Sequence, residues 1–224
     1  MSHRLALAIA ASLALATAAH AAAPIRVRGT IVAVSPTSIT MQTPAHTRVI
    51  VGLDKSTRYA VSTKSSLSAI QPGGYIGTAT KTVSGQHIAL EVVVFPPSMR
   101  GAGEGHYPWD KIPDTTKTDT MTHSSMTNGN VSMAMPVPTT KSSMTNGDVT
   151  TAASTGGSKT LIVTYKGGHE TILVPPTAPV VTVAPATISA AKDGASVFIV
   201  ATPAADGLVA AYVNTATGGI KLAM

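Results

Sequence analysis

The chain has 224 residues, of which 44% are hydrophobic and 4% aromatic, and its formal net charge is +6. It contains no cysteine, which excludes disulfides, thiolate metal sites and a lipid-modified N-terminal cysteine. Beyond the N-terminal region no apolar stretch of about 18 residues occurs, so a polytopic membrane protein is excluded too.

The first 21 residues have the pattern of a signal peptide. Arg4 supplies a positive charge, an apolar run extends from Leu5 to Leu15, and Ala19-His20-Ala21 matches an A-x-A cleavage site. The apolar run is shorter than the roughly 20 residues that cross a bilayer. We therefore expect cleavage near Ala21 and a periplasmic or secreted Gram-negative protein without a transmembrane span.

An internal repeat organises the rest of the chain. Residues 57–79 align with residues 178–200 at an offset of 121 positions, and the match extends outwards on both sides. No carboxylate or histidine recurs at matched positions. Two copies of one small β module are therefore expected, without a shared catalytic group.

The first module is predicted to span residues 24–98. Its strand-like segments alternate apolar and polar residues or are rich in β-branched ones, namely 25–34, 38–43, 49–53, 75–80 and 88–95. Between the third and the fourth, Leu67 and Ile70 fit one helical turn that plugs a barrel end. This order predicts an OB-like, five-stranded barrel.

Residues 99–144 are predicted to be a disordered linker, because Ser, Thr, Met and Gly are abundant and no periodicity is visible. The linker contains the motif Ser-Met-Thr-Asn-Gly at residues 125–129, and the same motif returns at 143–147. The second barrel module is predicted over residues 145–224, with strands at 149–153, 160–165, 170–174, 196–202 and 207–214. The expected fold is thus all-β, with two tandem OB-like barrels.

Four stretches carry a resemblance to a known group of proteins. They are Pro24 to Val32, Gly73 to Thr80, Glu91 to Asp110 and the Ser-Met-Thr-Asn-Gly motif. Over its mature length the chain resembles exported proteobacterial small-β-barrel proteins of unknown function, some of which are labelled as metal-transporter permease components. The resemblance implies a barrel fold and a place in the cell envelope, whereas the absence of long apolar stretches speaks against a permease.

The positive charge is concentrated in the first module. Residues 24–98 contain seven basic residues and two acidic ones, and this excess of positive charge suggests a polyanion- or partner-binding face. Arg26 and Arg28 lie two apart in a strand and are expected to face water on the side opposite Val27. The candidate binding residues are Arg26, Arg28, Arg48, Arg58, Tyr107 and Trp109. A merely solvated basic face is the alternative, and nucleic acid is not the expected partner because stacking aromatics are few.

The segment His106-Tyr107-Pro108-Trp109-Asp110 holds the single tryptophan of the chain. An aromatic pair that brackets a proline directly after a strand is expected to fold back over an open barrel edge or end. A partner-binding epitope is the alternative.

The same region holds candidate metal ligands. Met121, His123 and Met126 form a Met-x-His-x-x-Met pattern, and His106 lies nearby. Thioether and imidazole ligands favour copper, above all Cu(I). The alternative is a flexible linker whose methionines have no ligand.

Catalytic motifs are not apparent. His46, His87 and His169 fall in predicted turns and are expected to be exposed, and no nucleophile elbow, phosphate loop or nucleotide fingerprint occurs. We therefore expect a non-catalytic binding or interaction protein of the periplasm with an unknown ligand or envelope polyanion. A periplasmic protein that handles copper or another divalent cation, associated with metal transport, is the alternative.

Overall fold

The computed structural model describes residues 23–115, 121–136, 157–216 and 218–222. The described residues are almost entirely β-structure, as predicted, and the predicted signal peptide lies outside them. The strands are β1 (Ile25–Ser35), β2 (Ser38–Gln42), β3 (Arg48–Gly52), β4 (Arg58–Lys64), β5 (Tyr75–Val83), β6 (Gln86–Phe95), β7 (Gly105–Pro108), β8 (Ile112–Pro113), β9 (Met121–Thr122), β10 (Ser125–Pro136), β11 (Lys159–Tyr165), β12 (Gly168–Val174), β13 (Val180–Ala186), β14 (Ser196–Ala204) and β15 (Gly207–Ala216). Three short 3-10 turns complete them: η1 (Leu67–Ala69), η2 (Pro97–Met99) and η3 (Ile188–Ala190). Among these residues no helix is long and apolar enough to cross a membrane.

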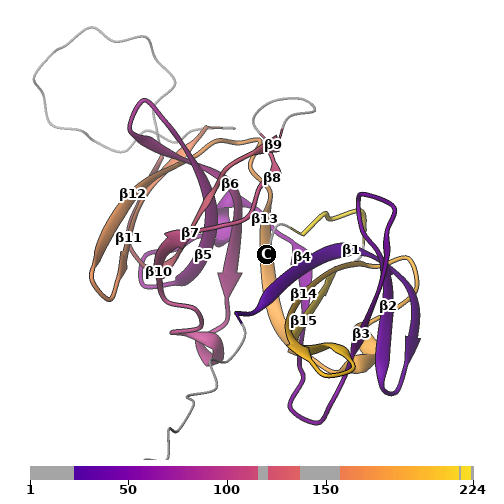
Figure 1. Ribbon diagram of the computed structural model, residues 1–224. Coiled ribbons are helices and arrows are strands. Elements are labelled where there is room, and N and C mark those ends of the chain that lie inside the picture. Colours follow the sequence, from indigo (N-terminus) through magenta and orange to yellow (C-terminus); the bar gives the residue numbers. More distant parts are fainter. Residues whose placement is uncertain (1–22, 116–120, 137–156, 217, 223–224) are drawn as a thin grey trace, which may run out of the picture.

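Ten of the strands close into two five-stranded barrels (Figure 1). Barrel A consists of β12, β11, β10, β5 and β6, and a short parallel pairing of His87 with Ile172 closes it between β6 and β12. Barrel B consists of β15, β14, β1, β2 and β3, and the equivalent pairing of Leu208 with Val51 closes it. All other pairings inside the two barrels are antiparallel.

Each barrel takes strands from both halves of the chain. In the N-terminal repeat, β1 to β3 belong to barrel B, whereas β5 and β6 belong to barrel A; in the C-terminal repeat, β10 to β12 belong to barrel A, whereas β14 and β15 belong to barrel B. The two repeats have therefore exchanged their last two strands, as in a domain swap within one chain. The predicted boundaries at residues 98 and 145 do not separate the barrels.

The exchange depends on β4 and β13, which run between the barrels as an antiparallel ribbon (Figure 1). β4 pairs in parallel with β15 of barrel B, and β13 pairs in parallel with β6 of barrel A. Seven residues of extended chain span roughly 23 Å, enough to carry each repeat from one barrel to the other. Both strands were absent from the predicted set, because turn-like and proline-containing sequence surrounds them.

β10 occupies in barrel A the place that β1 has in barrel B. A Cβ atom at Gly29 of β1 would collide with the carbonyl oxygen of Gln42, and one at Gly129 of β10 would collide with that of Thr164. Both strands shift register two residues after this glycine. The glycine of the first Ser-Met-Thr-Asn-Gly motif is thus a point of close backbone approach.

The prediction of a disordered linker is wrong for residues 99–115 and 121–136, where the structure has η2 and β7 to β10. The amino-acid composition suggested disorder because β10 has few β-branched residues. The strand forms because it pairs with two neighbouring strands, β5 and β11. The predicted strand at 149–153 and the second copy of the motif lie outside the described residues. The helical turn predicted near Leu67 is confirmed as η1, and its counterpart η3 contains Ile188.

Four apolar clusters form the core, and the smallest consists of Phe198, Ala216 and Leu222 on the side of barrel B that meets Trp109. The first fills barrel B, the second fills barrel A, and the third lies between the barrels, where β4, β5, β6, β10 and β13 meet residues 97–115. We name residues 97–115 the strap. Its side chains Met99, Tyr107, Trp109 and Ile112 pack on this third cluster, so the strap joins the two barrels along one face of the central sheet.

Candidate functional site

A cleft of about 800 Å³ lies between the barrels. The floor comes from Thr57 to Tyr59 of the β4 side and from Val183 and Pro185 of β13, one wall from β6 and β10, the opposite wall from β14 and β15, and the rim from the strap. A volume of this size is typical of small-molecule sites. We refer to it below as the inter-barrel cleft.

Aromatic side chains are concentrated in this cleft. The chain has five tyrosines, two phenylalanines and one tryptophan, and five of these eight residues line the cleft, namely Tyr59, Phe95, Trp109, Phe198 and Tyr212. The rings of Trp109 and Phe198 lie 6.2 Å apart and tilted. These residues come from the strap and from strands of both barrels, so only the assembled fold brings them together.

A phenol hydroxyl and an amide supply polar groups. Burial raises the pKa of Tyr212 to about 12, so its hydroxyl stays neutral and can donate a hydrogen bond to a ligand. Asn128 of β10 also lines the cleft. Its amide nitrogen donates to the Gly103 carbonyl at 2.8 Å and to the Tyr107 hydroxyl at 3.3 Å, which fastens the strap to barrel A.

The Asn128 carbonyl oxygen is buried and accepts no hydrogen bond from the described residues. It lies against Gly77 of β5, where a Cβ atom would collide with it. A buried acceptor without a donor costs about 1–3 kcal/mol, which the fold tolerates here beside the cleft wall.

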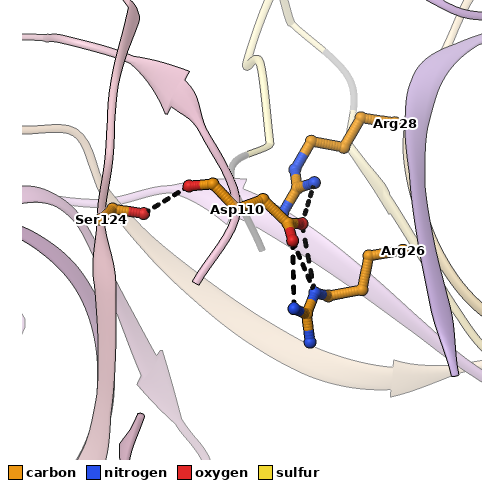
Figure 2. Close-up of polar contacts among 4 residues, drawn as sticks. All are labelled: Arg26, Arg28, Asp110 and Ser124. Atoms are coloured by element: carbon orange, nitrogen blue, oxygen red, sulfur yellow. Dashed lines mark hydrogen bonds and ion pairs between the residues drawn. The ribbon is translucent and has the colours of Figure 1, made fainter. Parts of the chain in front are cut away.

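Arg26 and Arg28 both reach the carboxylate of Asp110, the residue that follows Trp109 in the strap (Figure 2). Arg26 donates from Nε to both Asp110 carboxylate oxygens at 3.0 and 3.1 Å, and an Arg28 terminal nitrogen lies 2.6 Å from Asp110 Oδ2. The Arg26 guanidinium also lies 4.1 Å from the centre of the Trp109 ring. Ser124 donates to the Asp110 carbonyl oxygen at 2.7 Å, which fixes the carboxylate in place.

The prediction that Arg26 and Arg28 face water is wrong. Their side chains are only 28% and 18% exposed, and both are paired with Asp110. Burial lowers the pKa of Arg28, and the hydrogen bond and charge of Asp110 oppose that shift. The alternation argument failed because the strap covers this face of β1, so both sides of the strand are occupied.

The other predicted binding residues have different surroundings. Arg48 is exposed on β3, away from the cleft lining, whereas Arg58 is exposed at the start of β4 and contributes to the cleft. Tyr107 packs on Trp109 with ring centres 6.0 Å apart, and burial raises its pKa. The aromatic pair therefore packs on the apolar cluster between the barrels, and not over an open barrel edge or end, and Trp109 also lines the cleft.

The predicted copper ligands do not come together. Met126 is 1% exposed in the core between the barrels, whereas His123 is exposed. His106 of β7 pairs with Thr127 of β10 and contacts the Thr127 hydroxyl. Because Thr127 directly follows Met126 in the strand, the side chains of His106 and Met126 lie on opposite faces of the sheet. Nothing is described for the Met121 side chain. The Met-x-His-x-x-Met pattern thus runs from β9 into β10, with His123 between the two strands, and its second methionine belongs to the core.

Sequence reasoning missed most of the cleft. Tyr59, Phe95, Phe198 and Tyr212 stand on four separate strands up to 153 positions apart, and each one has the alternating context of an ordinary strand residue. The low aromatic content was the one available signal of a site. When a chain has few aromatic side chains, their gathering in one place of the fold indicates a binding site.

A second cavity of about 920 Å³ lies beside the β4–β13 ribbon, near the loops at 64–68 and 176–179. Its lining includes Thr115 and Gly218, which adjoin residues outside the described part of the chain. We therefore assign the candidate binding site to the inter-barrel cleft, which the described residues enclose.

Comparison with known proteins gives no match: no protein-family model, no curated protein and no solved structure is significantly similar to this chain. The site is therefore interpreted from its own chemistry.

Proposed function

We propose that this protein is a non-catalytic binding protein of the cell envelope, exported by its N-terminal leader, and that the inter-barrel cleft holds its ligand. The observation that carries the proposal is the gathering of five of eight aromatic residues in one cleft. Aromatic walls bind flat or apolar groups with a large buried area and few flexible bonds.

The polar groups of the cleft define the other half of the ligand. The neutral Tyr212 hydroxyl can donate a hydrogen bond, and Arg58 on the floor of the cleft supplies a positive charge. Such an arrangement fits a small amphipathic molecule with an apolar or aromatic body and an anionic or carbonyl-bearing end. Amide, phenol and guanidinium groups bind and orient rather than attack, which favours a binding protein over an enzyme.

Anilinonaphthalene sulfonate, a planar aromatic anion, is a suitable probe. Because the single tryptophan, Trp109, lines the cleft, bound probe should accept energy from Trp109 and show one saturable site. Truncating Phe95 or Tyr212 to Ala should weaken binding at least about tenfold, since one buried aromatic side chain contributes roughly 1.5–3 kcal/mol.

Two matched variants complete the test. Tyr212→Phe keeps the ring and should weaken binding only a few-fold, through loss of one hydrogen bond worth roughly 0.5–1.5 kcal/mol. Tyr165→Ala removes an aromatic residue outside the cleft and should leave binding unchanged. Equal affinity of the wild type and Phe95→Ala, with both proteins folded by circular dichroism, would show that the cleft is not the binding site.

A further inference from the structure

Two imidazoles, a carboxylate and a phenol meet on barrel A. His87 lies at the start of β6, His106 on β7, Tyr165 at the end of β11 and Glu170 on β12. The His87 Nε2 atom is 3.2 Å from one Glu170 oxygen, and the His106 Nδ1 atom is 4.0 Å from the other. The prediction that His87 is an exposed turn residue is wrong, because its side chain is only 23% exposed.

Barrel B shows that the fold does not require these groups. At the two barrel closures, His87 pairs with Ile172 in barrel A and Leu208 pairs with Val51 in barrel B. In the adjoining hairpins, Glu170 pairs with Val163 and the equivalent Val49 pairs with Met41. Barrel B therefore has leucine and valine, packed on its core, where barrel A has histidine and glutamate.

We propose that His87, His106 and Glu170 bind a divalent transition-metal ion. The His87 imidazole already has the outer hydrogen bond that orients a metal ligand, because Thr82 Oγ1 lies 3.3 Å from His87 Nδ1 and leaves Nε2 for the ion. His106 directs its Nδ1 atom toward Thr127 Oγ1, at 2.9 Å, and toward Glu170, so its Nε2 atom reaches the ion only after the ring turns. Tyr165 donates to the Glu170 carboxylate at 3.1 Å, which supports the third ligand.

The spacing fits ligands of one ion. Two donor atoms at about 2.0–2.2 Å from a tetrahedral ion lie roughly 3.3–3.5 Å apart, and His87 Nε2 and Glu170 are separated by 3.2 Å. Two imidazoles on one such ion have ring centres roughly 5–6 Å apart, and those of His87 and His106 are 5.6 Å apart.

The three side chains are not yet arranged around one point. In the described part of the chain, no three histidine, aspartate or glutamate side chains are arranged as a group ready to hold an ion. Binding therefore requires His106 to turn its Nε2 atom toward His87 and Glu170, with water completing the coordination. Nitrogen and oxygen ligands without sulfur favour Zn²⁺, Cu²⁺ or Ni²⁺ over Cu(I), unlike the methionine pattern at residues 121–126.

The test is titration of the chelator-treated full-length mature protein with Zn²⁺ by calorimetry, with Co²⁺ absorption as a second readout of coordination. We expect one ion per chain. The variant H87L/E170V, which installs the barrel B residues, should lose the ion while its melting temperature without metal stays equal or rises. Thr82→Val should weaken binding roughly 10- to 100-fold as the loss of an orienting group.

His169→Ala and His46→Ala serve as controls, because His169 is exposed at the start of β12 and His46 is exposed in the turn between β2 and β3, and binding should be unchanged. The proposal is overturned if the wild type takes up no more Zn²⁺ than H87L/E170V. It is equally overturned if His123→Ala abolishes binding and the double variant keeps it, since the ion would then be held by the segment that contains Met121 and His123.

Discussion

Barrel A and barrel B have the same strand order, the same glycine contact on the first strand and the same parallel closure, but they differ in what surrounds this frame. Barrel A carries the strap, the histidine pair and an ion pair between Lys81 and Asp114, with both side chains under one-tenth exposed. Barrel B has Leu208, Val49 and Thr202 at the positions that correspond to His87, Glu170 and Lys81. The shared positions specify the fold, so the positions at which the barrels differ are where function is to be sought.

The strongest test of this comparison is to isolate one repeat. Residues 24–98 contain β1 to β3 of one barrel and β5 and β6 of the other, so each set lacks its partners. We expect no stable monomer, and light scattering after size exclusion should show an unfolded chain or a swapped dimer. Co-expression with residues 99–224 should restore both barrels. A folded monomeric fragment would show that one repeat can close by itself.

Removing the ion pair that only barrel A has should come next in size. Lys81 Nζ lies 2.7 Å from Asp114 Oδ2, and loss of one partner leaves a buried charge that costs about 3–5 kcal/mol. Asp114→Ala should lower the free energy of unfolding by that amount in urea titrations. The equivalent of Lys81 in barrel B is Thr202, which is exposed, and Thr202→Ala should change stability by less than about 0.5 kcal/mol.

The ionisation of one buried tyrosine on each barrel allows the two barrels to be compared at high pH. Burial raises the pKa of Tyr75 in barrel A and of Tyr212 in barrel B from 10 to about 12. The folded state keeps these protons after the unfolded chain has released them, so stability falls as the pH rises from about 10 to about 12, by about 1.4 kcal/mol per pH unit for each residue. In the Tyr212→Phe variant, the urea midpoint should fall less steeply with pH across this range than in the wild type. An unchanged slope in that variant would contradict the assignment.

The smallest effect is expected where the strap meets barrel B. Asp110→Asn removes the charge that pairs with Arg26 and Arg28, and the partly exposed site limits the loss to about 1–2 kcal/mol. Thermal melting at low and high salt should show the difference between variant and wild type shrinking as salt screens the charges. Arg48→Ser, at an exposed position, is the control and should leave the melting temperature unchanged.

The sequence allowed the strand content of the first repeat to be predicted well. The segments predicted at 25–34, 38–43, 49–53, 75–80 and 88–95 correspond to β1, β2, β3, β5 and β6, because alternation of apolar residues and turn signals are local properties. The exchange of strands could not be predicted in this way. A strand buries the same face whether it pairs with its own repeat or with the other one, so the pattern is identical in both cases.

The candidate site was predictable only in part. Trp109 and Arg58 were expected to be binding residues and do line the cleft, because a single tryptophan and a basic cluster are visible in the sequence. The pairing of His87 with Glu170 was not foreseen, since it depends on the β6–β12 closure. That contact joins opposite halves of the chain and follows from the exchange.

The exchange also dictates the order in which the protein can fold. Strands β1 to β3 are synthesised first, yet barrel B closes only after β14 and β15, which begin at residue 196. Contacts between such distant segments form slowly, because the intervening chain must first be brought together. Barrel A can close once β12 is complete at Val174, whereas the edges of β1 to β3 stay unpaired and exposed to aggregation until β14 and β15 are made.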